Sequence, residues 1–125
     1  APLKINEDVV VPVDALAAFI GRLEGLAEEY GLPIVNFGHA GNGNIHVNLM
    51  VHPDDADEMA RARACLDRVF DTVLALGGTL SGEHGVGSEK APFVARELDP
   101  VSRELHRQIK QTFDPKGILN PGKAF

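Results

Sequence analysis

The chain has 125 residues, of which 44% are hydrophobic and 24% charged, and its formal net charge at pH 7 is −6. This length suits a single domain over 1–125 with a modest core, and the composition is typical of a soluble globular protein. The acidic balance, with no lysine–arginine block, argues against binding to nucleic acid. A single cysteine, no signal-peptide pattern and no apolar run near the roughly 18 residues of a membrane span predict a cytoplasmic protein.

The first half of the chain is predicted to form a strand, a helix and two further strands. A β-branched run that ends at a proline predicts the first strand over 8–12. Apolar residues at three- and four-residue steps predict a helix over 14–30, and Gly31 is expected to end it. A second strand over 33–38 leads toward a third over 45–51.

Alternation along the third strand gives it two different faces. One face is apolar and would pack against the helices: Ile45, Val47, Leu49 and Val51. The other face carries His46, Asn48 and Met50, and we expect it to look toward solvent or another domain.

Between these two strands, Asn42-Gly43 predicts a two-residue type I′ hairpin turn, because both central residues of that turn need a positive φ. This turn would pair Gly41 with Asn44, Ala40 with Ile45 and His39 with His46. Directly opposed residues share a face, with Cβ atoms roughly 5 Å apart. In this register Asn36 falls on the apolar side, which counts against it.

The second half of the chain is predicted to be mainly helical. Proline and acidic residues open a helix over 53–76 with a clear apolar stripe, and Gly77-Gly78 ends it. The patterns then predict a brief fourth strand over 79–80 and a glycine-rich loop over 81–88. A short helix over 88–98, a firmer helix over 99–113 and a terminal turn over 120–122 are expected to follow. The order β-α-β-β-α-β predicts an α+β fold, with a ferredoxin-like antiparallel sheet, helices on one of its faces and additional C-terminal helices.

His39, His46 and the Glu83-His84 pair are the residues best suited to chemistry. Two imidazoles and one carboxylate suit a divalent metal and leave coordination positions open for substrate or water. His84 would then be free to exchange a proton. Paired histidines on a strand are, however, more often ordinary surface or core residues, and the glycines around Glu83 could serve only to shape a turn.

Three motifs resemble one known family. Residues 38–48, 78–87 and 113–123 resemble, in order and spacing, the C-terminal part of FAD-linked oxidases. These flavoproteins belong to the vanillyl-alcohol-oxidase superfamily and include D-lactate dehydrogenase, D-2-hydroxyglutarate dehydrogenase and the glycolate oxidase flavoprotein subunit. The residues around the first predicted strand also look like this family's entry strand, so the resemblance covers essentially the whole chain.

The resemblance implies roles for individual residues. His39, His46 and Glu83 match the ligands of a divalent metal, which could be zinc, manganese or iron. His84 matches the base that takes the substrate hydroxyl proton while a hydride passes to FAD. Asn48 matches a substrate contact, and Asn120 matches a terminal motif near the flavin.

The chain departs from the family in two respects. Asn42 stands where the family usually has aspartate, so a negative charge near the metal ligands could be lost. The FAD-binding domain is also missing from this chain, which therefore looks like a fragment that would not turn over alone.

The expected partners follow from this resemblance. They are a small 2-hydroxy acid, the missing FAD-binding domain and an unidentified electron acceptor. A face exposed by the missing domain could also pair two copies in a homodimer. The full-length enzyme could lie at the periphery of a membrane. The alternative from a different class is a stand-alone metal-binding or assembly module without redox activity.

Overall fold

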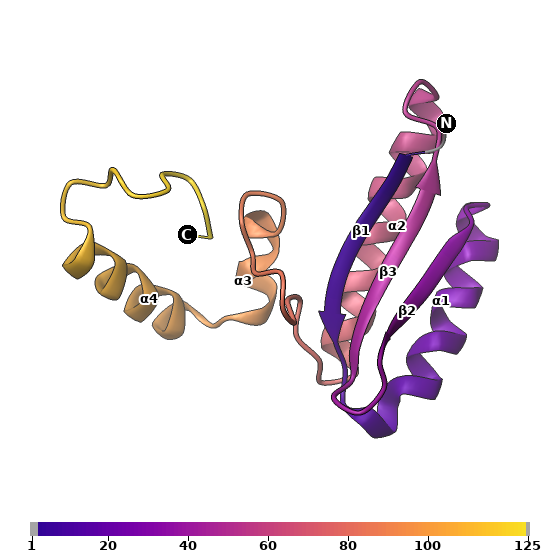
Figure 1. The fold of residues 1–125 in the computed structure, drawn as a ribbon, viewed down its shortest axis with the longest axis horizontal. Coiled ribbons are helices and arrows are strands. Elements are labelled where there is room, and N and C mark those ends of the chain that lie inside the picture. The colour runs from indigo at the N-terminus through magenta and orange to yellow at the C-terminus, as the bar shows by residue number, and fades with distance from the viewer. Residues whose placement is uncertain (1–2, 125) are drawn as a thin grey trace. The chain divides into compact units, whose positions relative to one another are not determined.

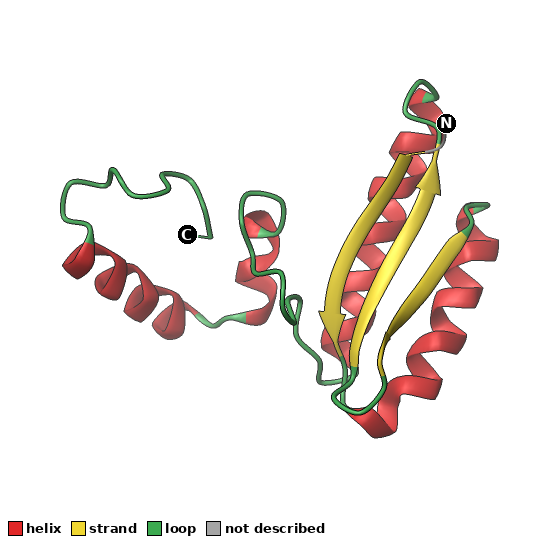
Figure 2. Cartoon of the chain, in the orientation of Figure 1, coloured by secondary structure: helices red, strands yellow, loops and turns green. Residues whose placement is uncertain are grey.

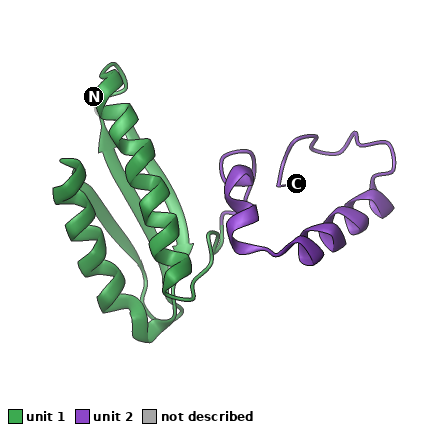
Figure 3. Cartoon of the chain, turned by 180° about the vertical axis from the view of Figure 1, so that it is seen from behind, with its two compact units in different colours: residues 1–83 green, residues 84–125 purple. Residues whose placement is uncertain are grey.

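The computed structural model describes residues 3–124, and the chain divides between Glu83 and His84 into two compact units (Figure 3). The elements of the first unit are β1 (Leu3–Val10), η1 (Val13–Ala15), α1 (Leu16–Tyr30), β2 (Ile34–His39), β3 (Asn44–Val51) and α2 (Ala56–Ala75) (Figures 1 and 2). The second unit contains η2 (Ala91–Phe93), α3 (Val94–Glu97) and α4 (Pro100–Phe113). None of the helices described is long and apolar enough to cross a membrane.

The first unit is built on an antiparallel sheet with strand order β1-β3-β2. Helices α1 and α2 lie against one face of this sheet, as the front and back views show (Figures 1 and 3). The predictions of an α+β fold, an antiparallel sheet and helices on one face are therefore confirmed. Strand β1 begins earlier than predicted and pairs with β3 along its whole length, from Leu3 with Val51 to Val10 with Asn44.

The predicted fourth strand over 79–80 is reduced to a single bridge between Thr79 and Val10. The two residues exchange backbone hydrogen bonds of 3.0 and 2.9 Å. Further along the chain, the backbone amides of Gly82 and Glu83 donate to the side chain of Asp8 instead of to a strand. Over the described residues the sheet thus has three strands, and the ferredoxin-like topology that depended on a fourth is not formed.

The predicted type I′ turn is wrong. His39 pairs with Asn44, so the hairpin loop has four residues, and Phe37 rather than His39 lies opposite His46. Gly43 has a φ of +75°, whereas Asn42 is not among the described residues with a positive φ. Within this longer loop, the Asn42 side chain accepts a hydrogen bond from the Asn44 amide.

The core of the first unit lies between the sheet and its two helices, and the predicted apolar stripes supply it. Fully or almost fully buried side chains come from all these elements: Val9, Phe19, Leu23, Val47, Leu49, Val51, Ala62, Cys65, Val69, Phe70 and Val73. The helix-facing side of β3 is therefore assigned correctly. Its opposite side is also largely buried, since His46 and Asn48 are only 7% and 2% exposed.

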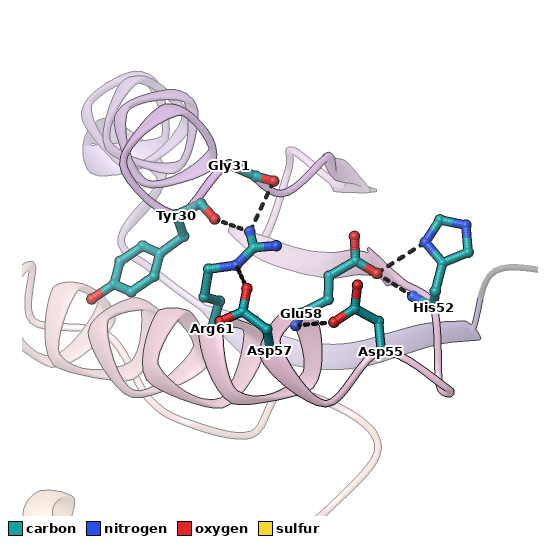
Figure 4. A network of polar contacts seen from close by, with 7 residues as sticks. All are labelled: Tyr30, Gly31, His52, Asp55, Asp57, Glu58 and Arg61. Atoms are coloured by element: carbon teal, nitrogen blue, oxygen red, sulfur yellow. Dashed lines mark hydrogen bonds and ion pairs between the residues drawn. The ribbon is translucent and has the colours of Figure 1, made fainter.

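Polar contacts fix the ends of the two helices (Figure 4). Gly31 adopts the left-handed conformation that ends α1, as predicted. The guanidinium of Arg61 on α2 donates hydrogen bonds to the carbonyl oxygens of Tyr30 and Gly31, which are among the unsatisfied groups of that helix end. Asp55 caps α2 by accepting from the Glu58 amide at 2.9 Å.

The second unit confirms the predicted helix over 99–113. Asp99 caps α4 by accepting from the amides of Val101 and Ser102, and Pro100 occupies its first turn. The predicted short helix over 88–98 appears as η2 and α3. The apolar residues of α4 are each between 52% and 80% exposed: Val101, Leu105, Ile109 and Phe113.

Candidate metal centre

His39, His46 and Glu83 meet at the turn end of the β2–β3 hairpin. Glu83 Oε1 lies 2.9 Å from His46 Nε2 and 4.0 Å from His39 Nε2. One ligand atom from each residue lies within 4.8 Å of the others. The structure thus brings together the three residues that the sequence singled out as a set.

The hairpin geometry explains why the two imidazoles share one face. Because His39 pairs with Asn44, it lies diagonally across from His46, and residues two apart on a strand point to the same side. The His39 and His46 rings approach edge to face, with centroids 6.0 Å apart. Phe37, directly opposite His46, packs against it with ring centroids 5.0 Å apart.

The three side chains differ in how far they are exposed to solvent. The His46 side chain is 9% exposed, whereas those of Glu83 and His39 are 52% and 63% exposed. A metal placed here would therefore have one ligand anchored in the sheet and two at the surface. Such an arrangement leaves coordination positions accessible, as in sites that also bind a substrate or water.

The donor set and its spacing fit a divalent transition metal. Metal–ligand bonds of about 2.0–2.2 Å at a tetrahedral centre place neighbouring donor atoms about 3.4 Å apart. The two measured separations from Glu83 Oε1, 2.9 and 4.0 Å, lie on either side of that value. Two imidazoles with one carboxylate suit zinc, manganese or iron.

Asp8 is a residue of this region that sequence reasoning missed. It is fully buried in β1 as the strand partner of His46. Its Oδ2 accepts hydrogen bonds of 2.8 Å from the amides of Gly82 and Glu83, and its Oδ1 accepts one of 2.6 Å from Asn44 Nδ2. The available signal was weak, because Asp8 follows Asn6 and Glu7 and only precedes the apolar run of Val9 to Val11.

Gly82 is required by the close packing around Asp8. A Cβ at this position would lie 1.8 Å from Asn44 Nδ2 and 2.9 Å from Asp8 Oδ1. The backbone of the Glu83 segment therefore passes directly over the carboxylate that holds it. The glycine next to Glu83 serves this close approach rather than only a turn.

Asn48 lies on the same face of β3 as His46. Its Nδ2 donates to the Val35 carbonyl at 3.0 Å, and its buried Oδ1 has no hydrogen-bond partner. The strand partner of Asn48, Asn6, also has a buried Oδ1 without a partner. Unsatisfied buried oxygens are rare in folded proteins, and here two of them lie in the row of residues next to His46.

The other two predicted site residues belong to the second unit. His84 is its first residue and is exposed. Asn120 is exposed with a φ of +47°, and it helps to line a hollow of about 690 Å³ together with Phe113, Lys110 and Lys123. Their roles stay predictions.

The chain matches the family described as "FAD linked oxidases, C-terminal domain" over residues 1–124. It is 39% identical over 124 residues to the glycolate oxidase subunit GlcD of Bacillus subtilis, covering 99% of this chain and 26% of that protein. It is 43% identical over 117 residues to a D-lactate dehydrogenase of Archaeoglobus fulgidus, covering 94% of this chain and 26% of that protein. It is 38% identical over 125 residues to a D-2-hydroxyglutarate dehydrogenase of Stutzerimonas stutzeri, covering 96% and 27%.

The chain therefore belongs to the family of C-terminal domains of FAD-linked oxidases. It spans about a quarter of the length of these curated relatives. Among solved structures, the 4-ethylphenol oxidase from Gulosibacter chungangensis is similar in fold, with a TM-score of 0.67 at 19% identity, covering 99% of this chain and 24% of that one.

Proposed function

We propose that the chain is the metal- and substrate-binding part of an FAD-dependent 2-hydroxy-acid dehydrogenase. The observation that carries this proposal is the meeting of His39, His46 and Glu83 at one point in a chain of the FAD-linked oxidase family. The names of the relatives mention glycolate, D-lactate and D-2-hydroxyglutarate, which share a hydroxyl next to a carboxylate. We expect a small acid of this class, in its D form where the carbon is chiral.

The residues of the first unit would hold and orient the substrate. His39, His46 and Glu83 would bind a divalent cation, which lowers the pKa of the substrate hydroxyl, and FAD held mainly by a preceding domain would accept the hydride. The Asn48 Oδ1 would accept a hydrogen bond from the substrate. Because Asn48 is only 2% exposed, neighbouring side chains must move aside for this contact.

The second unit would complete the reaction. His84, directly after Glu83 in the chain, would take the hydroxyl proton as a general base, so that loss of a proton and a hydride converts the hydroxy acid into a 2-oxo acid. Asn120 would lie near the flavin. The partners would be the FAD-binding domain and an electron acceptor still to be identified.

The test uses the complete product of the gene that encodes this chain. Mixed anaerobically with glycolate and with D- and L-hydroxy acids, it should lose its oxidised-flavin absorbance with at least one D-acid or glycolate. Bleaching that disappears after chelation and returns with metal would support the metal role. A gene product that contains no flavin domain would contradict the proposal and favour a metal-binding or assembly module.

A further inference from the structure

Asp8 is a fully buried carboxylate whose hydrogen-bond partners lie outside its own strand. Transfer of a carboxylate into a fully buried site is unfavourable unless hydrogen bonds compensate it. The partners of Asp8 come from two distant parts of the first unit, namely Asn44 at the start of β3 and the Gly82-Glu83 backbone. The carboxylate therefore fastens the segment before the second unit to the edge of the sheet.

This fastening decides where Glu83 lies. The Glu83 side chain is half exposed, so packing alone does not fix its rotamer or its backbone. Its amide donates to Asp8 at 2.8 Å, and its carboxylate reaches His46, the strand partner of Asp8, at 2.9 Å. The backbone and the side chain of Glu83 are thus both held by one pair of opposed strand residues, Asp8 and His46.

Asp8 does not itself fit the role of a metal ligand. Its Oδ1 is engaged by Asn44 and its Oδ2 by the amides of Gly82 and Glu83. It is also not a member of the group of ligand atoms that lie within 4.8 Å of one another. Its part in the centre must therefore be indirect.

We propose that Asp8 is the positioning residue of this centre, with Asn44 orienting its carboxylate, and that it sets the place of Glu83 beside His46. The expected effect on metal affinity rests on the proposed metal centre. Loss of an outer residue that orients a ligand commonly lowers metal affinity by about 10–100-fold. The structural part of the inference is that Asp8 holds the Gly82 and Glu83 amides by hydrogen bonds, and this can be tested without metal.

The first measurement is a titration of the 125-residue chain with Co²⁺, followed by the visible absorption of the bound ion. Asp8→Asn keeps the size and one acceptor oxygen but removes the charge, and we expect Co²⁺ to bind at least 10-fold more weakly, with an altered absorption spectrum. Asp114→Asn is the matched control. Asp114 is also buried and accepts from two backbone amides, those of Ile118 and Leu119, in the second unit. That variant should bind Co²⁺ within about twofold of the parent chain.

The second measurement is amide hydrogen exchange by NMR in the absence of metal. Asp8→Asn should accelerate exchange of the Gly82 and Glu83 amides at least 10-fold, while the amide of Val47 in the sheet stays protected. If Asp8→Asn does not fold, Asn44→Ala takes its place and should accelerate the same two amides by a smaller factor.

The outcomes separate the inference from the proposed function. If the parent chain binds no Co²⁺, the proposed metal centre fails for this chain, and the exchange data alone decide the role of Asp8. Unchanged exchange at Gly82 and Glu83 in the variant would overturn the inference. Unchanged Co²⁺ affinity alongside faster exchange would also overturn it, because the fastening would then have no effect on the ligand.

Discussion

His39 lies diagonally across the hairpin from His46, with the ring centroids 6.0 Å apart, because its strand partner is Asn44. The predicted register placed the two histidines directly opposite each other. The difference is two residues, and since the side-chain period of a strand is also two, both registers put the histidines on the same face. The predicted pairing of the histidines was thus wrong, but their common face was predicted correctly.

The two histidines should contribute unequally to metal binding. His46→Ala removes the buried imidazole 2.9 Å from Glu83 Oε1, and we expect Co²⁺ affinity to fall by more than the 10–100-fold typical of an outer residue. His39→Ala removes an exposed ligand and should lower affinity by less. Isothermal titration of the chain measures both, with His106→Ala as a control from the exposed surface of α4. Equal affinity in His46→Ala and the parent chain would contradict the ligand assignment.

His84 should affect turnover without affecting metal content. In the complete gene product, His84→Ala removes the proposed base, and we expect kcat to fall by about 10²–10⁴-fold, as is usual for loss of a general acid–base group. Metal stoichiometry and flavin content should stay at the parent level. Stopped-flow flavin reduction against pH measures the step directly. A variant that reduces its flavin at the normal rate would remove His84 from the mechanism.

Gly82→Ala should destabilise the first unit. The added Cβ would lie 1.8 Å from Asn44 Nδ2, so the segment must shift away from Asp8. Crowding of this kind in a packed region costs about 1–3 kcal/mol in the free energy of unfolding. Urea denaturation measures the change. Gly41→Ala is the matched control, because a Cβ there meets nothing within 4 Å, and that variant should unfold at nearly the same urea concentration as the parent chain.

Glu58 should make stability depend on pH in the acid range. A hydrogen bond from the backbone amide of His52 lowers the pKa of this carboxyl below its ordinary value of 4.5, with further contributions from the His52 side chain (Figure 4). A carboxyl whose pKa is lowered by folding stabilises the native state fully above 4.5, and this contribution is lost as pH falls through the lowered pKa. Thermal unfolding between pH 2 and 7 should therefore show a shallower acid decline in Glu58→Gln. Parallel curves for the two chains would rule out this contribution.

Cys65 should be unreactive in the folded chain. Burial raises the pKa of its thiol to about 11, so little thiolate is present near neutral pH, and the side chain is fully enclosed. Ellman's reagent at pH 8 should therefore react only as fast as the first unit opens. Rapid labelling under native conditions, comparable to that in urea, would contradict the packing of Cys65 beneath the sheet.

The helices and the core followed from local patterns that the structure preserves. Asp99-Pro100 begins α4 and Gly31 ends α1 because capping and the left-handed conformation are set by the residues at those positions. The hairpin register was less predictable, since the Asn42 side chain bonds to the amide of Asn44 and favours a longer loop over the type I′ turn.

The fourth strand and Asp8 depended on contacts across the chain. Thr79 and Leu80 have strand-like side chains, but the amides of Gly82 and Glu83 donate to the Asp8 carboxylate, which lies 74 and 75 residues away in sequence. The periodicity of apolar residues reflects local secondary structure and gives no sign of a contact between distant residues. The candidate ligands could be named because their residue types are chemically distinctive, whereas Asp8, which we propose positions Glu83, looked like an ordinary charge in a strand.

The link between Asp8 and Glu83 also bears on how the first unit forms. Closing the chain over 75 residues costs more conformational entropy than forming a local contact, so we expect this link to form late. During synthesis, the ribosome would release both histidines and the whole sheet before Glu83 could join them. The three-residue centre would therefore be completed only in the last stage of folding, and acquisition of metal would mark the molecules that have reached it.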